Sequence, residues 1–298
     1  MRSQIEGLAN LISNSYINFD LKIKSIFKNL PIELIPTSRF AYENLSSLKI
    51  EENTILISCG KKSVKASVYL KRKFKDLIFN IHIQDPKINY KLFDLIVCPE
   101  HDNLNFDNCI STLLAIHNIK FKKNIKNKNT INFIIGGPNK YFKFQQQTQE
   151  KILNEIKFLS NDFKVNVIPS RRTPRGLIEE LSKIDNENIV TFDDLFNPRK
   201  YGELLSMGNL QVVTWDSISM ISEAISSEAG TFLFKFEEKF CPKRYLKFFD
   251  KITKLNFAQF YNQNLKPYEI SIDEYNKNLK TKILNKIQSN LRFRSSNA

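Results

Sequence analysis

Short, continuous apolar runs alternate with longer helix-like segments along almost the whole chain. The apolar runs predict strands at 54–58, 79–84, 93–98, 131–135, 164–168, 188–192, 210–214 and 231–235. Helices are predicted at 3–13, 19–28, 62–75, 145–159, 174–183, 198–206, 217–227, 242–252 and 272–290. Strands that alternate with helices of this length form βαβ units, and strands that are apolar throughout belong to sheets covered on both faces. The sequence therefore predicts an α/β fold with parallel sheets.

A polar, basic segment at 120–129 has no strand or helix period, and it divides the pattern into two similar halves. We expect two Rossmann-like domains facing across a cleft, at 1–125 and 126–298, with the helix at 272–290 packing back on the first. A doubly wound domain normally begins with a strand and a glycine-rich turn. Here helix-like sequence begins at about Gln4, so we expect the first strand of the N-terminal domain to be absent from this sequence.

Composition limits the class of protein. The chain has 298 residues, 42% of them hydrophobic, which is enough for two domains. It has no apolar stretch long enough to span a bilayer and no signal-peptide pattern at its start. Its four cysteines form no C-x-x-C pair and are expected to be reduced thiols, and its three histidines do not cluster with them. We expect no metal site and no cofactor.

The net charge of +14 is compatible with an anionic partner. Codon bias toward Lys, Asn, Ile and Phe is the alternative explanation of this charge. The densest basic stretch, residues 61–75, is predicted to be helical; it is either a solvated helix face or a patch held at an anionic membrane surface. The expected location is the cytoplasm, with a peripheral place at the inner face of the membrane as the second reading. No nucleic-acid partner is expected.

The segment after the predicted strand 210–214 is the most informative for function. Asp216, Ser217 and Ser219 stand between that strand and a helix that carries Met220 and Glu223. A strand, a polar turn and a helix in succession expose backbone N–H groups to an anion, and ligands of open α/β sheets bind at the carboxyl ends of strands. Glu223, further along the helix, is placed to reach a sugar hydroxyl.

A glycine pair follows the predicted strand 131–135. Gly136 and Gly137, with Asn139 and Lys140 after them, allow positive φ and close approach of the backbone to a ligand. A plain tight turn explains the glycines equally well. The segment is not a Walker loop, because the terminal Gly-Lys-Ser/Thr is missing.

An arginine pair follows the predicted strand 164–168. Arg171 and Arg172 are suited to clamp a diphosphate, because guanidinium groups pair with phosphate in a bidentate manner. Thr173 before Pro174 is equally an ordinary N-cap with proline in the first helical turn, which explains these two residues but not the arginine pair. Tyr201 in the next helix either stacks on a base or packs in the core, and packing is the preferred interpretation.

Two segments of the first half carry ionisable or polar groups at strand ends. Glu100, His101 and Asp102 follow one strand, and His101 has the pKa range of a general base. Gln84 and Asp85 end the preceding strand and are candidates for binding the hydroxyls of an acceptor. A structural loop histidine and an aspartate in a turn before proline are the alternatives.

Taken together and in order, the motifs at 57–62, 83–86, 93–102, 135–142, 169–174 and 216–224 resemble the mitochondrial fission "elongated mitochondria" family. The motifs Pro-Glu-His-Asp, Gly-Gly-Pro-Asn-Lys and Ser-Arg-Arg-Thr-Pro carry this resemblance, which extends from about Gln4 to the last helices and points to the alphaproteobacterial members.

The resemblance implies a GT-B glycosyltransferase-like architecture, with an acceptor side in the first domain and a nucleotide-sugar donor site in the second. It implies a glycosyltransferase whose acceptor is a lipid or an envelope glycan. A non-catalytic adaptor that works through protein or membrane contacts, and a nucleotide-sugar epimerase, are the competing interpretations.

Overall fold

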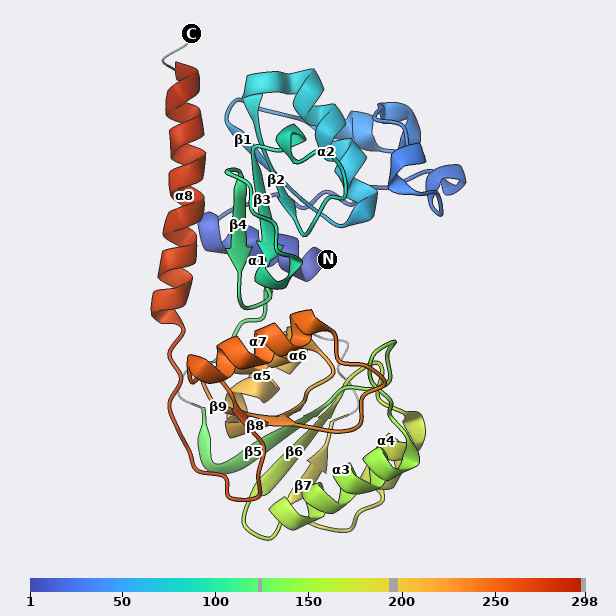
Figure 1. The fold of residues 1–298 in the computed structure, drawn as a ribbon, viewed down its shortest axis with the longest axis vertical. Helices are drawn as coiled ribbons and strands as arrows, with labels where there is room; N and C mark the ends of the chain where they lie inside the picture. The colour runs from blue at the N-terminus through green and yellow to red at the C-terminus, as the bar shows by residue number, and fades with distance from the viewer. Residues whose placement is uncertain (123–124, 193–197, 296–298) are drawn as a thin grey trace. The chain divides into compact units, whose positions relative to one another are not determined.

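The computed structural model describes residues 1–122, 125–192 and 198–295, except for the side chains of 198–199 and 291–295. The chain forms two compact units, one made of Met1–Asn118 with Asp273–Ala298 and the other of Ile119–Ile272 (Figure 1). Each unit is an α/β domain with its own parallel sheet. The predicted class, two Rossmann-like domains, is confirmed.

The first unit has a four-stranded parallel sheet in the order β1-β2-β3-β4. Its strands are β1 (Thr54–Cys59), β2 (Ile78–Ile83), β3 (Leu95–Pro99) and β4 (Cys109–Thr112). Its helices are α1 (Arg2–Ile12), α2 (Lys61–Phe74) and α8 (Asp273–Ser295). Helices α1 and α8 contribute Leu8, Leu279 and Ile283 to one apolar core against the sheet, whereas α2 covers the other face (Figure 1).

Residues 13–50 form a lobe that projects from the first unit (Figure 1). The helix predicted at 19–28 is wrong. Only the 3-10 turn Ser25–Phe27 forms there, because Lys22–Lys24 pair instead with Ala41–Glu43 through backbone hydrogen bonds and an antiparallel bridge between Ile23 and Tyr42. Further 3-10 turns follow at Ile32–Leu34, Arg39–Ala41 and Leu45–Ser47.

The second unit has a six-stranded parallel sheet in the order β10-β9-β8-β5-β6-β7. Its strands are β5 (Asn127–Ile135), β6 (Lys164–Pro169), β7 (Ile189–Thr191), β8 (Gly208–Thr214), β9 (Gly230–Phe234) and β10 (Gln259–Phe260). Its helices are α3 (Gln146–Leu159), α4 (Arg175–Ser182), α5 (Pro198–Met207), α6 (Ile218–Ile225) and α7 (Lys243–Lys254). Helices α3 and α4 cover one face, and α5, α6 and α7 cover the other (Figure 1).

A ladder of buried amides crosses the centre of this sheet. Asn132 of β5 accepts a hydrogen bond from Asn166 of β6 and donates one to Gln211 of β8, both at 3.0 Å. Asn132 and Gln211 also donate to the carbonyl of Leu205 at the end of α5. Buried amides are costly unless they are paired, so these bonds fix the register of three strands and dock α5 on the sheet.

Every strand predicted from the sequence exists, and β4 and β10 are additional. Strand β4 is four residues long and β10 is two, which is too short for a recognisable apolar period. Among the described residues, no helix has both the length and the apolar character needed to cross a membrane.

Candidate functional site

The best candidate site lies at the point where the strand order of the second unit's sheet reverses. From β5 the chain continues through β6 and β7 toward one edge, and then returns to β8, which pairs with the other side of β5. Loops after two such strands diverge and leave a crevice, where ligands of open α/β sheets bind. The loop of Gly136 and Gly137 follows β5, and Asp216 follows β8.

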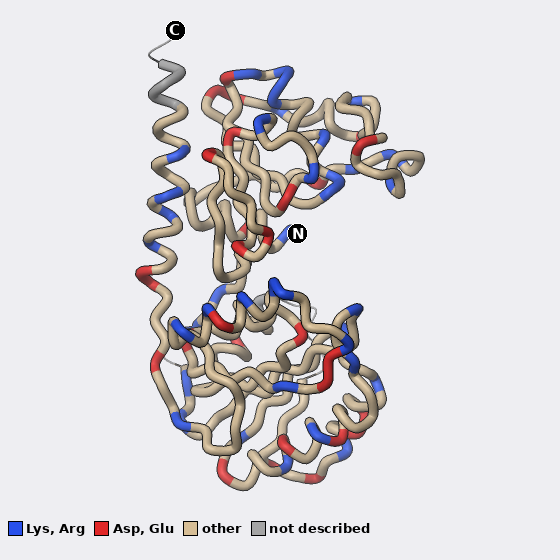
Figure 2. Tube along the Cα trace, viewed as in Figure 1, with Lys and Arg blue, Asp and Glu red and all other residues tan. Residues whose placement is uncertain are grey.

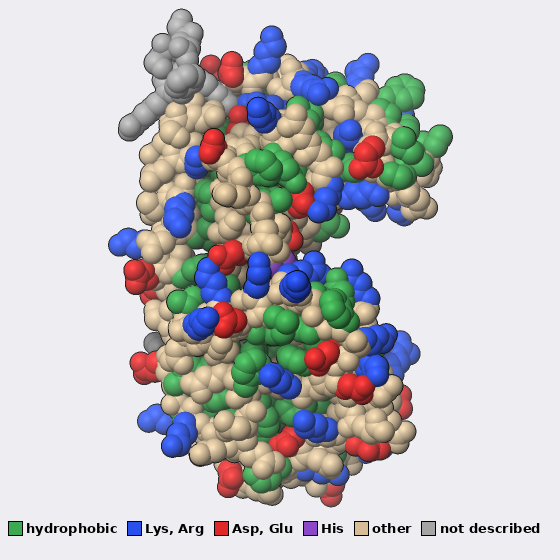
Figure 3. Space-filling model, viewed as in Figure 1, with side chains coloured by type: hydrophobic (Ala, Val, Ile, Leu, Met, Phe, Trp, Pro, Cys, Tyr) green, Lys and Arg blue, Asp and Glu red, His purple; other side chains and the backbone are tan. Residues whose placement is uncertain are grey.

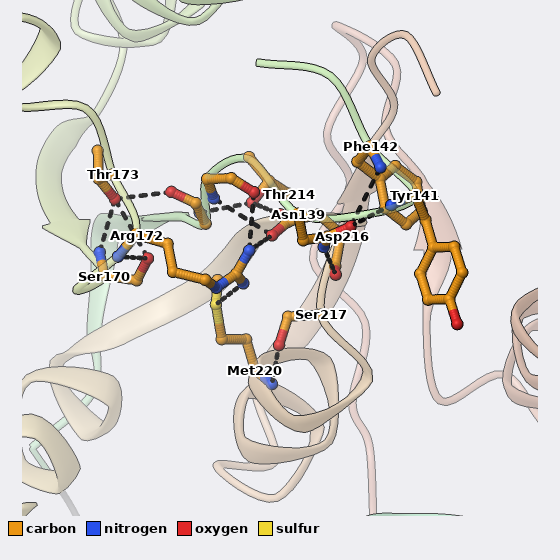
Figure 4. A network of polar contacts seen from close by, with 12 residues as sticks. Asn139, Tyr141, Phe142, Ser170, Arg172, Thr173, Thr214, Asp216, Ser217 and Met220 are labelled. Carbon is orange, nitrogen blue, oxygen red and sulfur yellow. Dashed lines mark hydrogen bonds and ion pairs between the residues drawn. The ribbon is translucent and has the colours of Figure 1, made fainter. Parts of the chain in front are cut away.

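Asp216 joins these two loops (Figure 4). Its carboxylate is fully buried; Oδ1 accepts a hydrogen bond from the Thr214 hydroxyl at 2.7 Å, and Oδ2 accepts one from the Gly137 amide at 3.2 Å. The Gly136 amide donates to Thr214 Oγ1 at 2.7 Å. The amides of both glycines are therefore used inside the site, although the sequence suggested them as ligand contacts.

Arg172 brings a third loop, the one after β6, into the same network. Its Nη1 lies 2.7 Å from Asp216 Oδ2 and donates to the Gly137 carbonyl, also at 2.7 Å. The guanidinium is thus fixed by the protein, yet the side chain keeps 36% exposure. Arg171, its neighbour, is exposed. The pair predicted to clamp a diphosphate consists of one anchored arginine and one that points to solvent.

The glycines are required by close packing. A Cβ on Gly136 would lie 2.1 Å from Asp216 Oδ1, and one on Gly137 would lie 1.9 Å from the Arg172 carbonyl oxygen. Neither has the positive φ that the sequence suggested: among the described glycines, only Gly60 does. What approaches the glycine backbone closely is the Asp216–Arg172 pair.

Thr173 is buried, and its hydroxyl serves the site. The hydroxyl contacts the carbonyl oxygens of Ile135 and Gly136 at 2.8 and 2.7 Å, and it accepts a hydrogen bond from the Ser170 amide. It therefore ties the loop after β6 to the end of β5. Pro174 is the residue at the N-cap of α4, so the cap that the sequence suggested for Thr173 is not its role.

The N-terminus of α6 opens beside the Asp216 network. Ser217 caps the helix, with its hydroxyl accepting from the Met220 amide at 3.4 Å, and Ser219 is exposed in the first turn. Helix geometry leaves the amides of Ile218 and Ser219 without partners inside the helix. These amides, together with the positive end of the helix dipole, form an anion-binding element.

Asn139 shapes the loop that follows the two glycines. Its Nδ2 donates to the Asp216 carbonyl at 3.0 Å, and its Oδ1 accepts from the Tyr141 and Phe142 amides. Tyr141 projects away from this network in Figure 4. Its hydroxyl accepts a hydrogen bond from Arg244 at 3.0 Å, and Lys140 Nζ lies 4.6 Å from its ring centroid. The Lys140 ammonium and the Arg244 guanidinium lower the pKa of Tyr141 and make this rim basic.

Glu223 lies half-buried further along α6. Its Oε2 accepts a hydrogen bond from the Tyr201 hydroxyl at 3.2 Å. Burial raises the pKa of Glu223 to about 7, although the Tyr201 hydrogen bond opposes this shift. Tyr201, for which packing was the preferred interpretation, is therefore also the hydrogen-bond partner of a carboxyl group that changes charge near neutral pH.

The candidates of the first half belong to the other compact unit. Glu100, His101 and Asp102 form a 3-10 turn directly after β3, and His101 Nε2 lies 3.8 Å from Asp102 Oδ1. Gln84 has the left-handed φ of 78°, rare outside glycine, and donates to Gln4 Oε1 at 2.9 Å.

Asp85 is held by its neighbours in sequence. It accepts hydrogen bonds from the Lys87 backbone and ammonium and from the Tyr90 hydroxyl. Burial raises the pKa of Asp85, but the Lys87 hydrogen bonds outweigh it, and the net pKa is lowered. This is the turn chemistry that the sequence offered as the alternative to acceptor binding.

Sequence reasoning missed three participants in the site of the second unit. Thr214 reads as the last residue of a strand, and Tyr245 and Arg244 lie on α7, far from any site motif. The Tyr245 hydroxyl contacts the Asp216 carbonyl at 3.4 Å. No local pattern marks such residues, because only the return of α7 over the sheet brings them there.

Known proteins support a family assignment. The profile of the family described as Mitochondrial fission ELM1 matches residues 1–282. An uncharacterized protein of Rickettsia prowazekii is 24% identical over 261 residues, covering 71% of this chain and 72% of that protein. The mitochondrial fission protein ELM1 of Arabidopsis thaliana is 23% identical over 213 residues, covering 58% of this chain. The match spans only 49% of the plant protein's own length.

Among solved structures, the chain is similar to the glycotransferase of kitacinnamycin. The TM-score is 0.45 at 11% identity, covering 88% of this chain and 75% of that one. Scores this low support no inference about activity.

Proposed function

The chain belongs to the Mitochondrial fission ELM1 family, and on that premise we propose that its second unit binds a nucleotide-sugar donor for glycosyl transfer. The observation that carries the proposal is the buried Asp216. Its carboxylate ties together three loops at the switch point of the sheet, beside the N-terminus of α6. Because this buried carboxylate fixes the loops at the strand ends, the loops are suited to hold a ligand in one geometry.

In this proposal, the diphosphate of the donor lies at the N-terminus of α6. The amides of Ile218 and Ser219 donate to it, and the charges of Arg171, Arg172 and Lys140 neutralise it. Glu223 accepts a hydrogen bond from a ribose hydroxyl. Helix dipole and guanidinium groups of this kind stabilise a leaving diphosphate without a bound metal.

The first unit supplies the acceptor side in the same proposal. His101, flanked by Glu100 and Asp102, takes the proton from an acceptor hydroxyl. At the same time, the oxygen of that hydroxyl forms a bond to the anomeric carbon of the donor sugar. The bond from that carbon to the diphosphate breaks, and the diphosphate leaves with the electron pair. Gln84 and Asp85 position the acceptor, a lipid or an envelope glycan.

Calorimetric titration with UDP and UDP-sugars, followed by the other nucleoside diphosphates, tests donor binding. The informative variant is Ser219→Pro, because proline is tolerated in the first turn of a helix but removes one amide donor. We expect a loss in nucleotide affinity of about tenfold, equivalent to one charge-assisted hydrogen bond. The matched control is Gln147→Pro in the first turn of α3, which should bind like the wild type. Equal losses in both variants would contradict the proposed diphosphate position.

Kinetics separate the proposed roles of His101 and Glu223. Glu223→Ala should raise the donor KM with little change in kcat, because its contact with the ribose exists equally in ground and transition states. His101→Ala should lower kcat by about 10²–10⁴ with donor affinity retained. Conversion of a nucleotide-sugar without any acceptor would instead identify an epimerase. A wild type that binds no nucleotide would leave the non-catalytic adaptor.

The basic stretch 61–75 supports a second element of the proposal, a peripheral place at the inner, anionic face of a membrane. This contact would be made by the first unit, whereas the proposed donor site belongs to the second.

A further inference from the structure

The lobe of residues 13–50 carries large apolar side chains on its surface. Ile17, Ile26, Leu34 and Phe40 are between 64% and 95% exposed. All four lie within residues 17–40, which is less than a tenth of the chain. Figure 3 shows apolar side chains gathered on the lobe. Single exposed apolar residues are ordinary, whereas a cluster on one projecting element marks an interaction surface.

The exposure of these side chains does not result from loose packing of the lobe. The lobe has a core of its own, in which Ile35, Ala41, Tyr42 and Leu45 pack against Ala66 and Leu70 of α2 and Ile78 of β2. The Tyr42 hydroxyl also donates to the Lys62 carbonyl at 3.2 Å. The 3-10 turns therefore hold one set of apolar residues in the core and a second set in solvent.

Basic residues outnumber acidic ones in the part of the chain that carries this apolar set. Segment 20–75 has twelve Lys and Arg against five Asp and Glu, which is half of the chain's net charge of +14. On the lobe itself, Lys24 Nζ lies 4.3 Å from the centroid of the Phe40 ring, so a cation and an exposed aromatic stand together. Figure 2 marks basic residues at both ends of α2, the helix on which the lobe packs.

The basic residues of α2 lie mainly at its two ends, and those of its first turn are costly. Lys61 and Lys62 occupy its first turn, which holds no acidic residue, and cations there oppose the helix dipole. Lys71 serves the fold, since it pairs with Asp94 at 2.7 Å and donates to the Ile78 carbonyl. Arg72, Lys73 and Lys75 are exposed at the other end of α2. The charges of the first turn are therefore placed at a cost to the helix, whereas those of the last turn favour the dipole and are also exposed, apart from the half-buried Lys71.

We propose that the lobe and α2 form a membrane-docking surface for an anionic lipid bilayer. Ile26, Leu34 and Phe40 enter the boundary between headgroups and acyl chains, and the surrounding Lys and Arg residues contact anionic headgroups. Apolar side chains within a basic surface match both layers of such a membrane, and each contribution alone gives only weak attachment. The inference concerns the first unit and does not depend on nucleotide binding by the second.

Sedimentation with phospholipid vesicles tests the proposal on the 298-residue chain. We expect binding to vesicles of phosphatidylcholine with phosphatidylglycerol, and weak binding to phosphatidylcholine alone. Raising the salt concentration should reduce binding, because it screens the charges. The triple variant Ile26→Ser, Leu34→Ser, Phe40→Ser should bind about tenfold or more weakly, since it loses the buried apolar area.

The matched control replaces three exposed apolar residues of the second unit, Phe240→Ser, Leu246→Ser and Leu255→Ser. It should bind like the wild type. Equal losses in both triple variants, binding that is independent of lipid charge, or no vesicle binding by the wild type would each overturn the proposal. All six positions are exposed, so both variants should fold, and thermal unfolding checks this.

A fluorescent reporter gives a second, independent measurement. The only tryptophan, Trp215, is buried in the second unit, so its emission should not respond to lipid. Phe40→Trp should shift its emission to the blue on anionic vesicles, whereas Leu246→Trp should not. A shift only in the Leu246→Trp variant would place the contact elsewhere and overturn the lobe as the docking surface.

Discussion

The aspartates that follow strands of the two parallel sheets are held by different kinds of partners. In the second unit, Asp216 accepts a hydrogen bond from the amide of Gly137, 79 residues away in sequence. It also forms an ion pair with Arg172 of a third loop. In the first unit, Asp85 is held by Lys87 and Tyr90, within five residues of itself. One carboxylate fixes several strand ends relative to each other, and the other closes a local turn.

This difference shows where a ligand geometry can be built. Long-range bonds between strand-end loops are preorganised by the whole sheet, so a contact of the ligand with one loop is positioned relative to the others. A locally closed turn offers no such coupling. The contrast favours the second unit as the donor-binding domain, and the following experiments can break or sharpen it.

The largest effect is expected for Asp216→Asn. It removes the buried charge that pairs with the partly exposed Arg172, and it leaves one oxygen to accept from both the Thr214 hydroxyl and the Gly137 amide. We expect a loss in unfolding free energy of about 3–5 kcal/mol, as for buried ion pairs that lose one partner. Urea denaturation followed by Trp215 fluorescence measures it.

The control for Asp216 is Asp250→Asn, which breaks an exposed pair with Lys254 on α7. It should change stability by less than about 0.5 kcal/mol. If both variants lose the same small amount, Asp216 does not organise the strand ends.

Glu223 is expected to give the next largest effect, and it depends on pH. Burial raises its pKa from 4.5 to about 7, so the folded protein favours the neutral form. Stability from this group is fully present below pH 4.5 and is lost as pH rises through about 7. Relative to wild type, Glu223→Gln should therefore gain roughly 3 kcal/mol by pH 8 and little at pH 4.5. A difference that is constant between these pH values would show that Glu223 is not buried in this way.

The two glycines Gly137 and Gly176 form a matched pair. A Cβ at Gly137 meets the Arg172 backbone at 1.9 Å, whereas one at Gly176, inside α4, meets nothing within 4 Å. Gly137→Ala should lose about 1–3 kcal/mol through overpacking. Gly176→Ala should gain up to about 1 kcal/mol, because alanine is the better helix former. Thermal unfolding of both tests how closely the loops are packed, and a stable Gly137→Ala variant would contradict the tight network.

The sequence predicted the α/β class, eight strands and the three site loops, because each is marked locally by an apolar run, a glycine pair or a helix start. It did not predict that Gly136 and Gly137 face Asp216, since this depends on the pairing of β5 with β8. It also predicted a helix at 19–28, where backbone pairing with Ala41–Glu43 overrides local propensity. Arg244 and Tyr245 join the site from a distant helix and leave no local signal.

The smallest expected effect belongs to the strand end of the first unit. Asp85→Asn removes a pair whose partner, the Lys87 side chain, is 74% exposed, so the loss in stability should stay below about 1 kcal/mol. Although burial raises the pKa of Asp85, the Lys87 hydrogen bonds lower it overall; its contribution is therefore present above pH 3.8 and is lost as pH falls through the lowered pKa. The wild type and Asp85→Asn should accordingly converge in acid, as measured by urea denaturation at several pH values. A loss as large as that of Asp216→Asn would mean that the two strand ends are built alike, and the contrast between the two units would fail.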